Sequence, residues 1–183
     1  MRKVTLGLAS SLDNFIARKN GGSDWLHWSN EVAAISARFM KTVDVLVMGR
    51  KTYEVMLAAG ETSYPGATNY VFTRSAKKAA ALRKRVGKKA AGNLQIVSDD
   101  AATFVGQLKS TTGKGIVVFG GGELASGLFN ADLIDEVVIN VHPVILGSGI
   151  PLFPEIKRQI NLELFEVMRL KNNCVVLSYR IQR

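Results

Sequence analysis

The sequence predicts an α/β protein whose central, mostly parallel sheet is covered by helices on both faces. Short and nearly continuous apolar runs alternate with segments of helical periodicity along most of the chain. Such runs are typical of strands that are buried on both faces of a parallel sheet. The end of the chain differs, because two apolar segments flank Lys171–Asn173 and predict an antiparallel hairpin that closes the sheet.

The first part of the chain predicts a strand, a loop, a helix and a second strand. Val4, Leu6 and Leu8 alternate with other residues, which is typical of a strand. A loop follows, and Ser29 or Asn30 is expected to cap the next helix. The apolar face of that helix is formed by Val32, Ile35, Phe39 and Met40. The run Val43 to Met48 predicts the following strand.

The later elements follow from the same patterns. A helix is expected to begin at Asp99 or Asp100 and to end at Lys109. Another apolar run extends from Val137 to Leu146. The remaining predicted strands are Tyr70 to Thr73, Leu94 to Val97, Ile116 to Phe119, Leu162 to Leu170 and Cys174 to Ile181.

The segment Ile116 to Ala125 carries the clearest chemical signal. A buried strand leads into Gly120-Gly121-Gly122, and a helix begins directly afterwards. Backbone N–H groups at a helix N-terminus, unshielded by side chains, can approach a pyrophosphate closely. A tight structural turn without a ligand is the alternative, because Asp135 precedes the next apolar run, whereas a Rossmann domain has an acidic residue at the end of that strand.

Two further turns combine a strand end with basic and hydroxyl side chains. Gly49–Glu54 follows one strand, and Phe72–Ser75 follows the next. Ligands of open α/β sheets collect at the carboxyl ends of the strands, so these turns and the glycine turn predict binding of a pyrophosphate and a ribose phosphate, as in NADPH. For each turn alone, a helix start with a surface cation is the alternative interpretation.

The composition sets further limits. A length of 183 residues predicts one domain over residues 1–183. We expect a cytosolic protein without membrane contact, because no apolar stretch approaches the length of about 18 residues that spans a bilayer. The single Cys174 excludes an internal disulfide and a cysteine cluster for zinc. His27 and His142 have no metal-ligand spacing, so no metal is expected.

The net charge of +9 is concentrated in one segment. Arg74 to Lys89 contains eight basic residues and no acidic ones. Ala79, Leu82, Val86 and Ala90 are spaced to form one apolar stripe, so we expect a helix whose charges face water. Binding of nucleic acid through this segment is the less favoured alternative, because the segment has no aromatic residue.

Several motifs together resemble a known superfamily. They are Ser11–Ala17, Asp24-Trp25-Leu26, Met48–Glu54, Phe119–Leu124, and Asp135-Glu136 followed by Pro143–Phe153. In this order they are similar to the dihydrofolate reductase-like superfamily, and most closely to the C-terminal reductase domain of the riboflavin-biosynthesis deaminase-reductase. The resemblance implies a three-layer dihydrofolate reductase-like fold, NADPH as the hydride donor, and a pterin-like or aminouracil-like substrate.

The resemblance also implies roles for individual residues. Those expected to contact the cofactor are Ala9, Ile16, Gly49, Arg50, Lys51, Thr52, Thr73, Arg74, Ser75, Phe119, Gly120, Gly121, Gly122 and Glu123. Asp13, Trp25 and Ile150 are expected to contact the substrate, with Trp25 either a lid over the ring or plain core. Asp24 or Glu31 would donate a proton if burial raised its pKa, the alternative being a solvated carboxylate.

We therefore expect an NADPH-dependent reductase that transfers a hydride to a heterocyclic substrate. A cofactor-binding protein of the same fold without turnover is the second hypothesis, and a basic nucleic-acid-binding protein is the third. A homodimer is expected from the apolar C-terminal strands.

Overall fold

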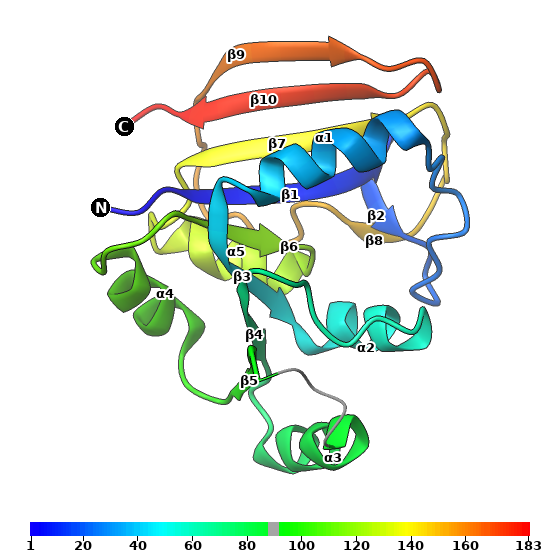
Figure 1. Ribbon diagram of the computed structural model, residues 1–183. Helices are drawn as coiled ribbons and strands as arrows, with labels where there is room; N and C mark the ends of the chain where they lie inside the picture. The colour runs from blue at the N-terminus through cyan, green and yellow to red at the C-terminus, as the bar shows by residue number, and fades with distance from the viewer. Residues whose placement is uncertain (88–91) are drawn as a thin grey trace.

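A computed structural model describes residues 1–87 and 92–183 (Figure 1). Strands and helices alternate through most of the chain, as the sequence predicts. The helices are α1 (Asn30–Met40), α2 (Arg50–Ala58), α3 (Ala76–Val86), α4 (Ala101–Lys109) and α5 (Gly122–Asn130). The strands are β1 (Val4–Ser11), β2 (Phe15–Ala17), β3 (Val43–Gly49), β4 (Thr68–Phe72), β5 (Leu94–Val97), β6 (Gly115–Phe119), β7 (Glu136–His142), β8 (Ile150–Pro151), β9 (Leu162–Arg169) and β10 (Val175–Ile181).

Eight strands form one sheet in the order β5-β4-β3-β6-β1-β7-β10-β9. Neighbouring strands from β5 to β7 are parallel, whereas β10 is antiparallel to both β7 and β9. Asn173 adopts a φ of 65° in the turn between β9 and β10, a conformation that asparagine tolerates well. The mostly parallel sheet and its C-terminal antiparallel hairpin are therefore confirmed.

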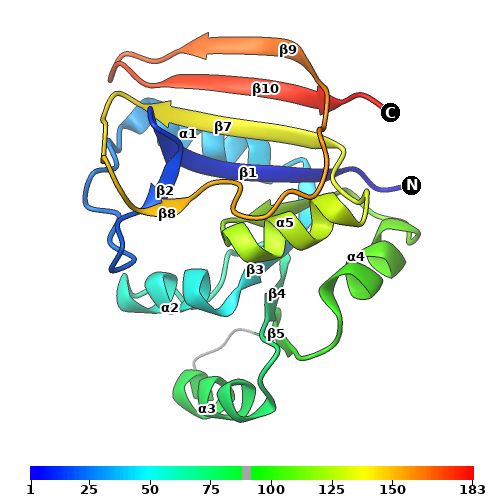
Figure 2. The ribbon, with the colours of Figure 1, turned by 180° about the vertical axis from the view of Figure 1, so that it is seen from behind.

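The helices form two layers around the sheet. α1 crosses one face in Figure 1, and α5 crosses the opposite face in Figure 2. Within β3, Val45 and Val47 pack in the core that contains α4 and α5, whereas Leu46 and Met48 pack in the core that contains α2 and α3. Because alternate side chains of one strand enter different cores, β3 needs apolar residues at nearly every position.

The structure departs from the sequence prediction in two places. β7 ends at His142 instead of continuing to Leu146, because the next residue is Pro143, which has no backbone N–H for the sheet. The short antiparallel pair β2–β8 was not predicted. It joins segments more than 130 positions apart, and neither strand is long enough to show a periodic pattern.

The basic segment forms α3 as predicted. Within α3, Ala79, Leu82 and Val86 are buried, and the lysine and arginine side chains are exposed. Lys88, Lys89 and Ala90, which we included in the predicted segment, lie outside the described residues. Among the residues that the structure describes, no helix is both long enough and apolar enough to cross a membrane.

Candidate functional site

The three turns singled out in the sequence follow adjacent strands of the sheet. β4, β3 and β6 are neighbours and run parallel, so their carboxyl ends meet along one line. Gly49 pairs with Phe72, and Val47 pairs with Val118. We call the turns after these strands the carboxyl edge, which comprises 49–52, 72–75 and 120–123.

Two helices begin at the carboxyl edge without a side-chain cap. The N-cap residues of α2 and α5 are Gly49 and Gly121, and neither caps its helix with a side-chain hydrogen bond. By contrast, Ser29, Ser75 and Asp100 cap α1, α3 and α4 through their side chains. A helix leaves its first N–H groups without intrahelical acceptors, so α2 and α5 present these donors to a ligand.

The two uncapped helix starts lie next to each other. Gly121 has a φ of 84°, in the left-handed region that favours glycine. A side chain at Gly121 would begin 3.6 Å from the backbone nitrogen of Gly49, so the starts of α5 and α2 are in van der Waals contact. A side chain at Gly122 would begin 3.0 Å from the carbonyl oxygen of Pro151. Glycine at position 121 therefore allows the left-handed turn, and glycine at position 122, which is buried, lets α5 pack closely on β8.

Basic side chains line the same edge. Arg74 donates a hydrogen bond of 2.8 Å from Nη2 to Oε2 of Glu123, which links the turn after β4 to the start of α5 (side-chain exposures 93% and 72%). Arg50 binds both carboxylate oxygens of Glu54 at 2.6 Å within α2. Lys51 is exposed beside Arg50. The edge therefore combines neutral backbone donors with cationic side chains, a combination suited to phosphate.

Two of the hydroxyl groups at the carboxyl edge already accept hydrogen bonds from backbone N–H groups. The Ser75 hydroxyl accepts from the N–H of Lys78 at 3.3 Å, and the Thr73 hydroxyl accepts from the N–H of Ser75 at 3.4 Å. Thr52 lies against Gly120, where a side chain would begin 3.1 Å from its Oγ1. Thr73 and Ser75 thus shape the start of α3, while Thr52 faces the glycine turn.

Asp13 holds two loops together beyond the end of β1. Its Oδ1 accepts from the Ser11 hydroxyl at 2.7 Å and from the N–H of Leu146 at 3.0 Å, and its Oδ2 accepts from the N–H of Gly147 at 2.7 Å. These bonds, that from Ser11 foremost, lower the pKa of Asp13. The carboxylate expected to contact substrate thus positions the loop between β7 and β8. Ala9 lies near the end of β1, and Ile16 and Ile150 lie in the β2–β8 pair beside this loop.

The structure does not favour Asp24 as a proton donor. Its carboxylate forms two hydrogen bonds, of 2.8 and 2.9 Å, with the Arg18 guanidinium. This pairing lowers the pKa of the exposed Asp24 and outweighs desolvation, whereas the expectation required a raised pKa. The adjacent Trp25 is 5% exposed and packs edge-on against His142, with ring centroids 5.5 Å apart. Trp25 is therefore a fixed wall and not an open lid.

Glu31 lies in the first turn of α1, at the opposite side of the loop from Asp24. Its Oε2 accepts a 2.8 Å hydrogen bond from the N–H of Lys171 in the β9–β10 turn. The bond ties α1 to the hairpin, so Glu31 also has a structural partner. The structure thus gives both candidate acids partners away from the carboxyl edge.

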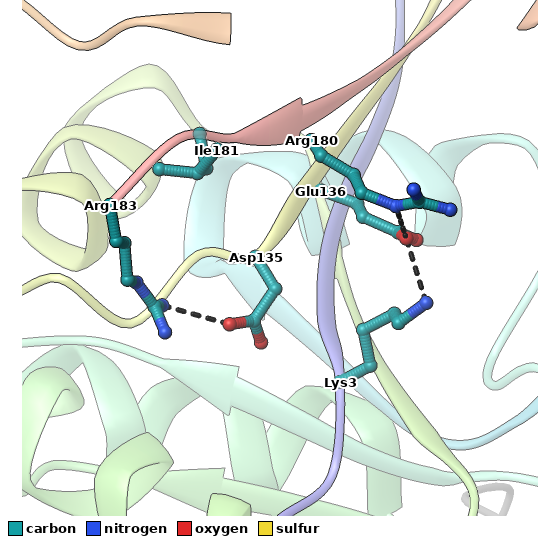
Figure 3. Close-up of a pocket in the computed structure, with 6 residues that line it drawn as sticks. All are labelled: Lys3, Asp135, Glu136, Arg180, Ile181 and Arg183. Atoms are coloured by element: carbon teal, nitrogen blue, oxygen red, sulfur yellow. Dashed lines mark hydrogen bonds and ion pairs between the residues drawn. The ribbon is translucent and has the colours of Figure 1, made fainter. Parts of the chain in front are cut away.

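Two hollows among the described residues lie at the amino ends of the parallel strands instead. One, of about 240 Å³, is lined by Lys3, Asp135, Glu136, Arg180, Ile181 and Arg183 (Figure 3). Its charges pair internally: Lys3 with Glu136 at 2.7 Å and Arg183 with Asp135 at 2.8 Å. The other hollow, of about 480 Å³, lies beside the starts of β3 and β4. Because ligands of such sheets bind at carboxyl ends, we assign the site from the helix starts and not from these hollows.

Comparison with known protein families identifies the chain. The sequence model of the RibD C-terminal domain matches residues 2–176. The chain belongs to this family. Protein YwjB of Bacillus subtilis, which is uncharacterized, is 36% identical over 165 residues, covering 89% of both chains. The riboflavin biosynthesis protein RibD of Corynebacterium ammoniagenes is 28% identical over 154 residues, which are 80% of this chain and 44% of that protein.

Solved structures show the fold of this RibD C-terminal domain. A Shewanella sp. PV-4 protein provisionally named for riboflavin biosynthesis superposes over the full length of both chains, with 26% identity and a TM-score of 0.79. Dihydrofolate reductase from Enterococcus faecalis, solved with NADP(H), matches 99% of this chain and 97% of its own, with 17% identity and a TM-score of 0.68. The three-layer, dihydrofolate reductase-like fold is confirmed, and the fold is of a reductase type.

Sequence reasoning missed several residues of this RibD C-terminal domain. Glu54 is the partner of Arg50, and an acidic residue four positions after an arginine at a helix start is a signal that could have revealed it. No sequence pattern indicates the cluster of His27, His142 and Cys174, whose ligand atoms lie within 4.8 Å of one another. These residues are separated by 115 and 32 positions, so only the fold brings them together.

Proposed function

We propose that this RibD C-terminal domain is an NADPH-dependent reductase. The observation that carries the proposal is the pair of uncapped helices α2 and α5, whose glycine N-caps lie next to each other at the carboxyl edge. The N–H groups of Gly122, Glu123 and Leu124 precede the first intrahelical bond of α5, which runs from Ala125 to Gly121. Two such sets of donors, each at the positive end of a helix dipole, fit the two phosphates of a dinucleotide.

The cations of the carboxyl edge favour NADPH over NADH. Arg50, Lys51 and Arg74 add positive charge beside the helix starts. An arginine fork can bind two oxygens of the 2′-phosphate that distinguishes NADPH. We assign the remaining contacts with the adenosine and diphosphate to Gly49, Thr52, Thr73, Ser75, Phe119, Gly120, Gly121 and Glu123.

The nicotinamide end is assigned to the region between β1 and the β2–β8 pair. Ala9, Ile16 and Ile150 are partly buried there and offer an apolar surface that excludes water from one side of a ring. Asp13 fixes the loop after β7 against the turn after β1. NADPH supplies a hydride when bound, and these residues orient the ring and the acceptor for its transfer.

The proton for the reduced substrate comes from Glu31 or from solvent. Asp24 is disfavoured because its ionised form is held by Arg18. Replacing Glu31 by Gln retains the acceptor for the Lys171 N–H and removes the acid, so a loss of turnover without loss of NADPH affinity identifies Glu31 as the donor. Unchanged turnover assigns the proton to water.

The substrate class follows from the family and its structural relatives. A Thermotoga maritima protein of this fold, with a TM-score of 0.72 and 14% identity, is named a diaminohydroxyphosphoribosylaminopyrimidine deaminase and 5-amino-6-(5-phosphoribosylamino)uracil reductase. We propose a pterin-like or aminouracil-like heterocycle, which would bind between Trp25 and the loop that carries Ile150.

Titration of the purified protein with NADPH and NADH tests the proposal. We expect saturable NADPH binding at one site per chain and weaker NADH binding, and then NADPH oxidation with a member of a panel of pterins and aminouracils. Absence of saturable NADPH binding would refute the proposal. NADPH binding without oxidation across the panel supports a second candidate, a cofactor-binding protein without turnover, which the ion pair between Asp24 and Arg18 favours.

We also propose that the protein forms a homodimer through β9 and does not bind nucleic acid. Among residues 1–87 and 92–183, no strand lies beyond β9 in the sheet, so β9 is an edge strand. Its apolar residues Leu162, Leu164, Phe165 and Val167 are exposed. Apolar surface on an edge strand is a template for pairing with a second chain. Sedimentation analysis should give a dimer mass for the wild type and a monomer mass for Val167→Lys; a monomeric wild type rules out the dimer.

A further inference from the structure

A cluster of potential metal ligands lies outside the carboxyl edge, beneath the N-terminal end of α1. His142 ends β7, Cys174 precedes β10, and His27 lies in the loop before α1. The side chains of His142 and Cys174 are buried, with residue exposures of 3% and 0%, whereas His27 is exposed. One ligand atom from each residue lies within 4.8 Å of the others. Two buried donors and one solvent-facing donor thus converge on one point.

Hydrogen bonds hold the three segments in place. The N–H of His27 donates to Nδ1 of His142 at 3.0 Å. Asn172 donates from Nδ2 to the carbonyl oxygen of His27 at 2.7 Å and accepts from the N–H of Cys174 at 3.2 Å. The loop before α1 is therefore fixed to both β7 and the start of β10, and a metal that binds Nδ1 of His142 has to displace only the His27 N–H from it.

These contacts also determine the tautomer of His142. Because Nδ1 accepts a hydrogen bond, it carries a lone pair, and the ring proton lies on Nε2. Nε2 is 3.3 Å from Nδ2 of Asn140, and Oδ1 of Asn140 is buried without a hydrogen-bond partner. Turning the Asn140 amide by half a turn brings Oδ1 to the Nε2–H and gives both atoms a partner. A metal-binding histidine is oriented in this way, with its second nitrogen donating to an oxygen.

We propose that His27, His142 and Cys174 form a zinc site with solvent as the fourth ligand. Sγ of Cys174 lies 3.4 Å from Nδ1 of His142. Zn–S and Zn–N bonds of about 2.3 and 2.0 Å in a tetrahedron place sulfur and nitrogen about 3.5 Å apart, so the observed spacing fits. Zn²⁺ replaces the His27 N–H at Nδ1, and the thiol proton of Cys174 leaves to solvent as the Zn–S bond forms.

The donor set selects the class of cation. One sulfur and two imidazole nitrogens suit Zn²⁺ and similar borderline or soft ions, whereas Mg²⁺ and Ca²⁺ require oxygen ligands. The exposed His27 leaves one side of the site open to water. Binding would fasten the loop that carries Trp25 to the sheet, because Trp25 already packs on His142.

Titration of the full, chelator-treated protein with Co²⁺ alone tests the site. We expect a thiolate-to-cobalt charge-transfer band that saturates at one Co²⁺ per chain and disappears when Zn²⁺ is added. Cys174→Ser should abolish this band. His27→Ala should weaken Co²⁺ binding at least about tenfold while the fold is retained, because His27 is exposed.

Two further variants separate ligation from nearby structure. Asn140→Ala should keep the charge-transfer band but weaken Co²⁺ binding about 10–100-fold, since it orients His142 without touching the metal. Lys171→Ala changes an exposed neighbour in the β9–β10 turn and should leave binding unchanged. A wild type without the band, or a band that persists in Cys174→Ser, would overturn the site.

Discussion

Arg74 tests whether the carboxyl edge recognises the extra phosphate of NADPH. Its guanidinium is 93% exposed and binds Glu123, which is itself 72% exposed. An exposed ion pair of this kind contributes about 0–1 kcal/mol to folding, so Arg74→Ala should leave the free energy of unfolding nearly unchanged. Any large effect of this substitution must therefore appear in cofactor binding.

The expected loss can be worked out from the chemistry of the contact. A hydrogen bond between charged groups contributes about 1.5–3 kcal/mol, and the high exposure of Arg74 places it at the lower end. A loss of about 1.5 kcal/mol weakens NADPH binding about tenfold. NADH lacks the 2′-phosphate, so its affinity should change less than about twofold.

Glu123 gives a prediction of opposite sign. Its carboxylate competes with the cofactor for Arg74 and places negative charge in the first turn of α5, beside the expected diphosphate. Glu123→Gln removes both effects and should tighten NADPH binding about 2–5-fold.

Fluorescence titration at fixed ionic strength measures these affinities, with Arg85→Ala as the control. Arg85 is an exposed residue of α3, so its removal lowers the net charge equally without touching the edge. Equal losses in Arg74→Ala and Arg85→Ala, or equal losses for NADPH and NADH, would refute the reasoning.

Two predictions concern stability. Lys109→Met should lower the free energy of unfolding by about 3 kcal/mol in urea titrations, because Lys109 is buried and donates to Asp135 at 2.5 Å. As the control, Lys3→Met removes an exposed partner of Glu136 and should change the free energy of unfolding by less than about 1 kcal/mol. Equal changes in the two variants would contradict this reasoning. Asp100→Ala should lower the Tm at pH 7 by about 2–4 °C, because Asp100 caps α4. Hydrogen bonds from Thr103 lower the pKa of Asp100, so its stabilising effect is present at neutral pH and is lost as the pH falls through that lowered pKa. The Tm difference between wild type and variant should therefore shrink in acid, and a constant difference would contradict this reason.

Features that depend on local chemistry were predicted from the sequence. We expected caps at Ser29 or Asn30 and at Asp99 or Asp100, and Ser29 and Asp100 are the caps, because a short polar side chain before an apolar periodic segment satisfies free N–H groups. The strands β3 and β6 were found because burial on both faces demands continuous apolar runs. Because parallel strands end at the same edge of a sheet, the sequence also predicted that the turns after them lie along one edge.

Features that depend on distant contacts could not be predicted. Asp13 holds the loop between β7 and β8 in place because it accepts hydrogen bonds from the N–H groups of Leu146 and Gly147, which lie more than 130 positions away in the sequence. Likewise, the sequence around Asp24 does not reveal that Arg18 bends back to bind it. Such partners are brought together by tertiary packing, which produces no periodic pattern in the sequence.

Amide NMR spectra of the labelled protein during NADPH titration test the central claim most directly. Binding between the starts of α2 and α5 predicts the largest shifts at the backbone N–H groups of Gly49–Thr52 and Gly120–Leu124. Saturable binding with the largest shifts around Lys3 and Arg183, in the hollow at the opposite edge, would contradict it.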